Sequence, residues 1–127
     1  SKRNRPFGIH YCGPDPHRYA KTFGKIDDLD FLDVGWGGDV KLLREHLPKT
    51  FLNIRLDAVT IGESPDSEIE TTITRRVRES DNPWLTGICC INMDDKVDDS
   101  KINVIFETVN ELRAQYHGES QAPRRTK

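Results

Sequence analysis

The stretch RPFGIHYCGPD, residues 5–15, sets the pattern from which the expected fold follows. A short apolar run, residues 7–9, leads into His10, Tyr11 and Cys12 and stops at a Gly-Pro pair. Short apolar runs bounded by Gly and Pro are typical of buried strands. We therefore interpret residues 7–9 as a strand, followed by a loop whose polar side chains are candidates for a functional site.

The same pattern of apolar run and polar loop recurs along the chain. Further apolar runs lie at residues 31–34, 51–54 and 85–93. Segments with helical features separate them or follow the last one, at residues 14–23, 39–47, 64–80 and 100–116. Alternation of this kind predicts an α/β fold with a parallel sheet and right-handed crossovers. Ligands of such folds bind at the carboxyl ends of the strands, where the polar loops of this chain also lie.

Helix ends and the tail follow from individual residues. Asp39 is expected to cap the second helix, and Ser64, followed by Pro65, to cap the third. Residues 1–117 are expected to form one domain. Residues 118–127 are polar and are expected to form a disordered tail.

Four βα units can form an open sheet or one half of an eight-stranded (β/α)8 barrel of the TIM type. The first strand begins within a few residues of Ser1, and no Met precedes it, so we expect a piece of a longer chain. Half a barrel leaves two unpaired strand edges, which natural proteins avoid exposing. The expected partner is therefore a missing amino-terminal half or a second copy of the chain.

Charge and cysteine content narrow the class of protein. The 127 residues include 19 basic and 21 acidic side chains and carry a net charge of -2. This charge gives no reason to expect electrostatic binding to nucleic acid. The apolar runs are too short to span a bilayer. Three cysteines, an odd number, argue against a disulfide scaffold and favour a reducing cytoplasm.

Two soft ligands lie on the first strand. His10 and Cys12 are two residues apart, so their side chains are expected on one face. Cys89 and Cys90 end the fourth strand, and as neighbours they face opposite sides, so at most one of them can meet the first pair. Three such ligands with an open position are typical of a catalytic zinc site. The alternative is that the cysteines are buried thiols and His10 hydrogen-bonds a loop.

Four segments of the chain resemble the uroporphyrinogen decarboxylase superfamily. They are IHYCG at residues 9–13, LDFLDVGWGGDVKLLREHL at 29–47, FLNIRLDAVTIGESPDSEIETTI at 51–73 and GICCINMDDKVDDSKINVIFETVNEL at 87–112. The resemblance is to the carboxyl-terminal half of that barrel, strands five to eight, and it covers nearly the whole chain except the tail.

The resemblance implies one of two activities. Decarboxylases of the superfamily need no metal and anchor their substrate through the amino-terminal half. Its methyltransferases carry a zinc held by H-x-C and a distant Cys, which activates a thiol for methyl transfer. His10 and Cys12 match the H-x-C, and Cys89 or Cys90 matches the distant Cys; the separation 89 − 12 = 77 favours Cys89.

The resemblance thus implies zinc-dependent methyl transfer from a corrinoid, on a corrinoid protein, to a thiol or similar acceptor. Its alternatives are a metal-free decarboxylase-like lyase and a fragment that is inactive without its amino-terminal half. One departure from the methyltransferase pattern is the sequence GICCI, residues 87–91, where those enzymes have G-C-G.

Three further residues are candidates for binding a substrate. Asp33 shares a strand face with Gly35 and approaches the site from a position further from the carboxyl end of the strand. Trp36 walls a pocket or packs within its loop. Arg55 binds an anionic group or pairs with Asp57.

Other polar residues near the strand ends have simpler interpretations. His17 is a partner of a zinc ligand or an exposed helical His. Asp94 and Asp95 orient a ligand or form a solvated turn, and the turn is favoured.

Overall fold

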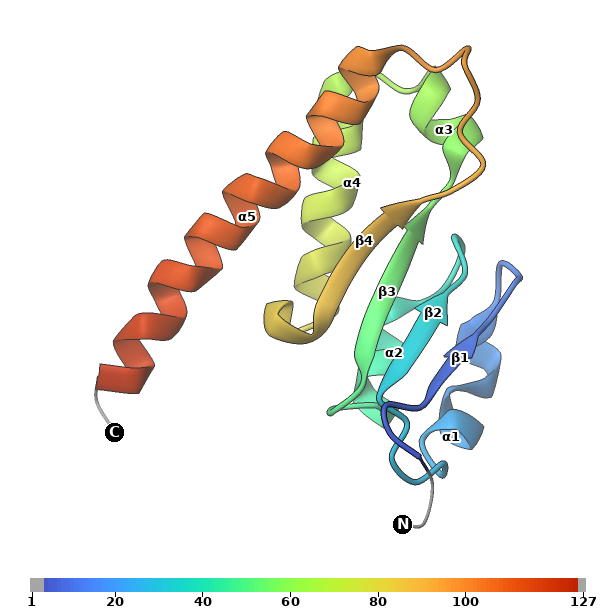
Figure 1. Ribbon diagram of the computed structural model, residues 1–127, viewed down its shortest axis with the longest axis vertical. Coiled ribbons are helices and arrows are strands. Elements are labelled where there is room, and N and C mark those ends of the chain that lie inside the picture. The colour runs from blue at the N-terminus through green and yellow to red at the C-terminus, as the bar shows by residue number, and fades with distance from the viewer. Residues whose placement is uncertain (1–3, 126–127) are drawn as a thin grey trace.

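The computed structural model describes the backbone of residues 4–125 and the side chains of residues 4–117, and it has an α/β fold built on one parallel sheet (Figure 1). The strands are β1 (Gly8–His10), β2 (Phe31–Val34), β3 (Phe51–Leu56) and β4 (Thr86–Cys90). The helices are η1 (Pro16–Tyr19), α1 (Ala20–Phe23), α2 (Val40–His46), α3 (Ala58–Glu63), α4 (Asp66–Glu79), η2 (Pro83–Leu85) and α5 (Asp99–Arg125). The predicted alternation of strands and helices is confirmed.

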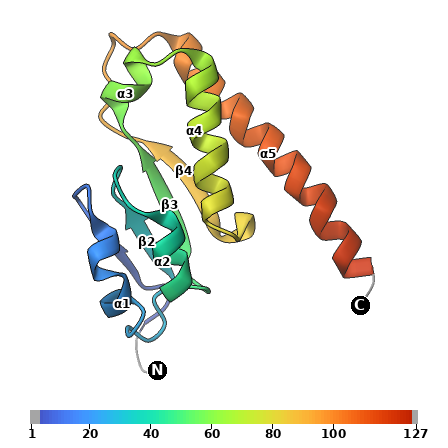
Figure 2. The same ribbon diagram turned by 180° about the vertical axis from the view of Figure 1, so that it is seen from behind.

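The strands pair in the order of the sequence, β1-β2-β3-β4, and every pair is parallel. Each crossover therefore leads to the adjacent strand, always in the same direction across the sheet. Crossovers that share one handedness then all lie on one face of the sheet. α1, α2 and α4 cover that face, as the two opposite views show (Figures 1 and 2). The arrangement is compatible with one half of an eight-stranded barrel.

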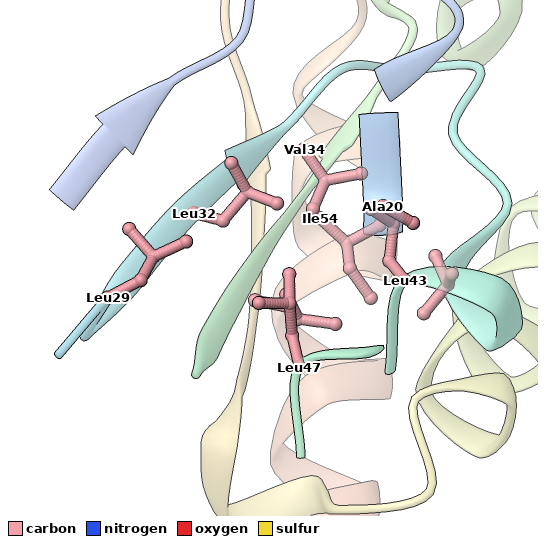
Figure 3. Close-up of a cluster of buried hydrophobic side chains, with 9 residues drawn as sticks. Ala20, Leu29, Leu32, Val34, Leu43, Leu47 and Ile54 are labelled. Carbon is pink, nitrogen blue, oxygen red and sulfur yellow. The ribbon is translucent and has the colours of Figure 1, made fainter. Parts of the chain in front are cut away.

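The covered face carries the hydrophobic core. Leu32, Val34 and Ile54 are fully buried and meet Leu43 of α2 and Ala20 of α1 (Figure 3). A second cluster lies at the other end of the sheet, where β3 and β4 meet α3, α4 and α5. Its buried members are Leu56, Ile61, Ile69, Ile73, Val77 and Leu112. The two central strands, β2 and β3, thus bury alternate apolar side chains, as expected for a face packed on helices.

No helix among residues 4–125 covers the opposite face, which we call the free face (Figure 1). Near the amino-terminal ends of the strands, the rings of Phe31 and Phe51 stack there with centroids 5.8 Å apart. A Cβ on Gly87 would come within 2.9 Å of the Phe51 ring, so glycine leaves room for that ring against β4. The free face thus begins with an aromatic layer, above which polar side chains follow.

Some helix boundaries differ from those predicted. Asp39 caps α2 as expected, by accepting a 3.0 Å hydrogen bond from the Leu42 N–H. The prediction that Ser64 caps the next helix is wrong, because α4 begins at Asp66 and Pro65 occupies the N-cap. The short helix α3 was not predicted, since its six residues contain a glycine and too few apolar positions to show a period.

The last helix is longer than its apolar period indicates. α5 runs from Asp99 to Arg125, whereas the sequence predicts a helix over residues 100–116. It thus includes residues 118–125 of the expected tail, and residues 126–127 lie outside the described part of the chain. Along residues 4–125, none of the helices combines the length and the apolar character needed to cross a bilayer.

A buried arginine joins three parts of the fold. Arg44 of α2 donates to four backbone carbonyls, at 2.6 Å to Ser80, 2.9 Å to Leu47, 2.7 Å to Thr50 and 2.9 Å to Leu85. Burial lowers the pKa of its guanidinium from the usual value. The hydrogen bonds offset this desolvation and tie α2 to the segments that precede β3 and β4.

Replacing Arg44 tests this connection. Arg44→Met keeps an apolar stem but leaves buried carbonyls without donors, so we expect a loss of about 3 kcal/mol in the free energy of unfolding. Chemical denaturation followed by circular dichroism measures it. The control Arg75→Met removes an exposed pair with Glu79 and should change stability by less than about 0.5 kcal/mol. Equal effects of the two substitutions would contradict a structural role for Arg44.

Candidate functional site

Strand register brings predicted site residues, together with Asn53, which was not predicted, to one face. His10, Asp33 and Asn53 are paired across β1, β2 and β3, and Arg55 is paired with Cys89 two residues further along. Paired residues of parallel strands point to the same side of a sheet. These side chains therefore share the free face, near the carboxyl ends of the strands and above the aromatic layer.

The loops after β1 and β2 touch each other. A Cβ on Gly35 would lie 1.7 Å from the Gly13 carbonyl oxygen, so only glycine permits this approach. The Tyr11 N–H also donates to the Asp33 carbonyl at 3.1 Å, which continues the pairing of the two strands beyond His10. These contacts hold the end of β1, with Cys12, beside the end of β2.

Asp33 is the centre of a charged cluster. One of its oxygens, Oδ2, lies 2.5 Å from His10 Nδ1 and accepts a hydrogen bond of 2.6 Å from the Arg55 guanidinium. A carboxylate only accepts hydrogen bonds, so the contact assigns a proton to Nδ1 and leaves Nε2 of a neutral ring with its lone pair. Of the two alternatives for Arg55, the pair with Asp57 is not formed: Arg55 pairs with Asp33, and Asp57 accepts from Thr60 Oγ1 at 2.6 Å.

This cluster is desolvated and incompletely paired. Arg55 is only 7% exposed. The other carboxylate oxygen of Asp33, Oδ1, and the Nε of Arg55 are buried and have no hydrogen-bond partner among the described residues. Burial lowers the pKa of Arg55, but the hydrogen bond to Asp33 and the charge of Asp33 act against it, and the pKa is raised overall. Arg55 is therefore a protonated cation whose buried Nε has no partner among the described residues.

The three cysteines occupy different environments. Cys89 accepts a 3.2 Å hydrogen bond from the Asn53 amide, and its pKa is raised by burial and by the charge of Asp33. Cys90 faces the helices, where it packs against the second core cluster, and burial raises its pKa to about 11. Cys12 is exposed. Of the two adjacent cysteines, Cys89 is thus the one on the face of His10.

Trp36 lies beside a small cavity in the loop after β2. The cavity has a volume of about 180 Å³, and its lining includes Trp36, Arg55 and Thr60. Arg76 of α4 fixes this loop by donating to the carbonyls of Gly38 at 2.7 Å and of Trp36 at 3.1 Å. The Trp36 ring itself is half exposed. The structure thus brings two predicted substrate-binding residues to one cavity, and the third, Asp33, pairs with one of them.

The remaining candidates lie in loops. His17 Nδ1 accepts a hydrogen bond of 3.2 Å from the Asp39 N–H, so it joins η1 to the start of α2. Asp94 accepts from the Lys96 N–H at 2.9 Å, and Asp94 and Asp95 are both exposed. The interpretation of these aspartates as a solvated turn is confirmed.

Sequence reasoning missed Asn53. It alternates with Arg55 in β3 and with Asp57 just after the strand, and polar residues at every second position of an otherwise apolar strand mark a functional face. That period of two was the available signal.

The predicted zinc ligands do not form a cluster with the geometry of a metal site. Among the side chains of residues 4–117, no three or more His, Cys, Asp and Glu lie close enough together to share an ion. Arg55 is the strand partner of Cys89, and the charge of its guanidinium acts to lower the pKa of the Cys89 thiol against the larger, raising effect of burial. A cation among the expected ligands repels a second cation. The charge of Arg55 therefore weighs against a zinc ion at this position, and the zinc site stays a prediction.

Comparison with known proteins adds no assignment. No protein-family model matches the chain, and no curated protein matches it.

Cysteine reactivity tests the three environments. Because the thiolate is the reactive form, iodoacetamide at pH 8 should modify exposed Cys12 first and Cys90 last, since the pKa of Cys90 is about 11. Mass spectrometry of peptides taken over time measures the order. Modification of Cys90 should quicken as the pH rises toward its pKa. Fast labelling of Cys90 at pH 8 would contradict its burial against the helices.

Proposed function

We propose that this chain forms the carboxyl-terminal half of a uroporphyrinogen decarboxylase-like barrel and that its site acts on a carboxylate-bearing substrate as a metal-free lyase. The observation that carries the proposal is the buried Asp33–Arg55 pair, in which Arg55 Nε and Asp33 Oδ1 have no partner among the described residues. A buried donor without a partner is unfavourable until a ligand satisfies it. The pair is therefore prepared to receive a polar group.

Arg55 supplies the affinity for an anion. A guanidinium binds a carboxylate through two parallel N–H groups, and Nε is one of the donors used in such a pair. Since Arg55 is already desolvated, a substrate carboxylate gains a stronger interaction there than with an exposed arginine. Trp36, at the rim of the adjacent cavity, offers a flat apolar surface for an aromatic ring of the substrate.

His10 supplies the proton. Its Nδ1 is held by Asp33, so Nε2 faces away from that contact. Decarboxylation breaks a C–C bond, releases CO2 and leaves the electron pair on carbon, which then takes up a proton. When Nε2 also carries a proton, His10 donates that proton to the carbon and keeps the Nδ1 proton that Asp33 accepts.

The free face supports the barrel part of the proposal. The interior of a (β/α)8 barrel is filled by layers of inward-pointing side chains, and its active site lies at the carboxyl ends of the strands. Here an aromatic layer of Phe31 and Phe51 is followed by the polar residues of the cluster. Four further strands would enclose both layers, and they come from an amino-terminal half or a second copy.

Ligand binding tests the role of Arg55. We expect the chain to bind a stable, oxidised porphyrin that carries carboxylate side chains, and to bind the corresponding amide more weakly. Arg55→Met should weaken carboxylate binding about tenfold or more, because it removes a charged hydrogen-bond donor. The control Arg78→Met, on the exposed side of α4, should change nothing. Equilibrium dialysis measures the affinity of the unaltered chain and of both variants for each of the two ligands. Equal affinities of the unaltered chain and Arg55→Met for the carboxylate would overturn the proposal.

A second candidate is zinc-dependent methyl transfer from a corrinoid, carried by a corrinoid protein, to a thiol. The observation that favours it is the contact between His10 Nδ1 and Asp33, because histidines that bind metals commonly present their other nitrogen to a carboxylate. His10, Cys12 and Cys89 would be the ligands, and zinc would activate the acceptor thiol. The position of Arg55 among these residues is why we rank it second.

Metal analysis separates the two candidates. For the first candidate, we expect the chain, expressed with zinc present and purified without chelators, to hold far less than one zinc per molecule by mass spectrometry of the elements. One zinc per chain that Cys89→Ala loses and Cys90→Ala keeps would establish the second candidate instead. Cys90 is the matched control because it lies on the other face of the same strand.

A further inference from the structure

The outer side of β4 has an apolar groove next to it. The groove has a volume of about 750 Å³. Its floor is formed by β4, and its wall by the apolar residues of α5 at helical spacing: Ile102, Ile105, Phe106 and Val109. Phe106 is 65% exposed. Figure 1 shows α5 lying beyond the edge of β4 and diverging from it. An exposed aromatic ring over an unpaired strand edge is a surface that proteins normally cover.

The opposite end of the sheet has a complementary edge. β1 pairs only with β2 among residues 4–125, so its outer side is also open. The helical turn that follows β1 carries the rings of Tyr19 and Phe23, which with Tyr11 form a cluster with centroids 5.9 to 6.4 Å apart. Tyr19 is 42% exposed. This end is thus a strand, open on one side, with an aromatic helix attached.

We propose that two copies of this chain pair head to tail, with β1 of each copy against β4 of the other, and that η1 and α1 fill the groove between β4 and α5. A strand added to β4 in this sheet must be parallel and must carry its helix on the covered face, because all crossovers of the sheet lie there. β1 with η1 and α1 is such a unit. This unit can therefore extend the sheet beside β4 while all crossovers keep the same handedness.

The number of strands supports two copies. Four strands from each copy give eight, the number with which a parallel βα sheet closes into a barrel. Closure of the barrel pairs the open edges of both β1 and β4 in each copy. A dimer formed by pairing β4 with β4 would leave both β1 edges open. A twofold axis along the barrel relates the two joints, so the assembly ends at a dimer and does not extend as a fibre. The same closure encloses Phe31, Phe51 and the Asp33–Arg55 pair.

The mass of the purified chain in solution is the primary test. Sedimentation equilibrium should give twice the 14.6 kDa of one chain across the micromolar range. A monomer at every concentration overturns the proposal. This measurement needs no ligand. The dimer can therefore be disproved while carboxylate binding by Arg55 is confirmed, and carboxylate binding can be disproved while the dimer is confirmed.

A matched pair of variants locates the interface. Phe106→Asp places a charge in the groove and should convert the dimer to a monomer. Val59→Asp should leave the dimer intact, because Val59 is also 65% exposed but lies on α3, outside the groove. Circular dichroism confirms that each variant is folded. A dimer that survives Phe106→Asp, or that both substitutions break equally, would place the contact elsewhere.

Mixing two variants tests the head-to-tail arrangement. Tyr19→Asp alters the β1 end and should by itself also give monomers. In a mixture of Phe106→Asp and Tyr19→Asp chains, one joint of the mixed dimer combines the intact groove of one chain with the intact β1 end of the other. Partial recovery of the dimer is therefore expected. A mixture that remains monomeric would overturn the pairing of these two surfaces.

Discussion

All features of this chain depend on one constraint, the sequential order of its parallel strands. Because each right-handed crossover moves to the next strand in the same direction, the crossovers lie on one face of the sheet. The helices bury the apolar half of each strand there, including Leu32 and Ile54. The remaining half of each strand is left without a cover among residues 4–125, and it carries the aromatic layer and the charged cluster.

The charged cluster follows from this arrangement. On the covered face, a side chain as polar as Arg55 or Asp33 would displace core residues. On the free face, the two pair with each other and with His10 close to the carboxyl ends of the strands. Arg44 and Arg76 are also buried, but among helices and loops, where backbone carbonyls accept their hydrogen bonds. Arg55, which keeps a donor without a partner, is thus distinguished from the structural arginines by its hydrogen bonds.

Much of the site could be predicted from the sequence, because period-two alternation assigns strand faces. His10 and Cys12 were expected to meet a residue of the fourth strand, and the strand register shows that Cys89 is on the face of His10 while Cys90 packs against the core. The partner of Arg55 could not be predicted, because Asp33 and Asp57 are both near it in a parallel sheet and only the side-chain geometry distinguishes them. The helix over residues 58–63 was missed because six residues are too few for a helical period.

The order of the strands and of the long helices, the polar loops after the strands and the cap at Asp39 follow from the sequence, because they depend on neighbours along the chain. The pairing of Arg55 with Asp33, the position of Arg55 beside Cys89 and the groove between β4 and α5 come from the three-dimensional fold. These features depend on strand register and on the packing of α4 against α5. Both arise from contacts between residues far apart in the sequence, and no local pattern contains them.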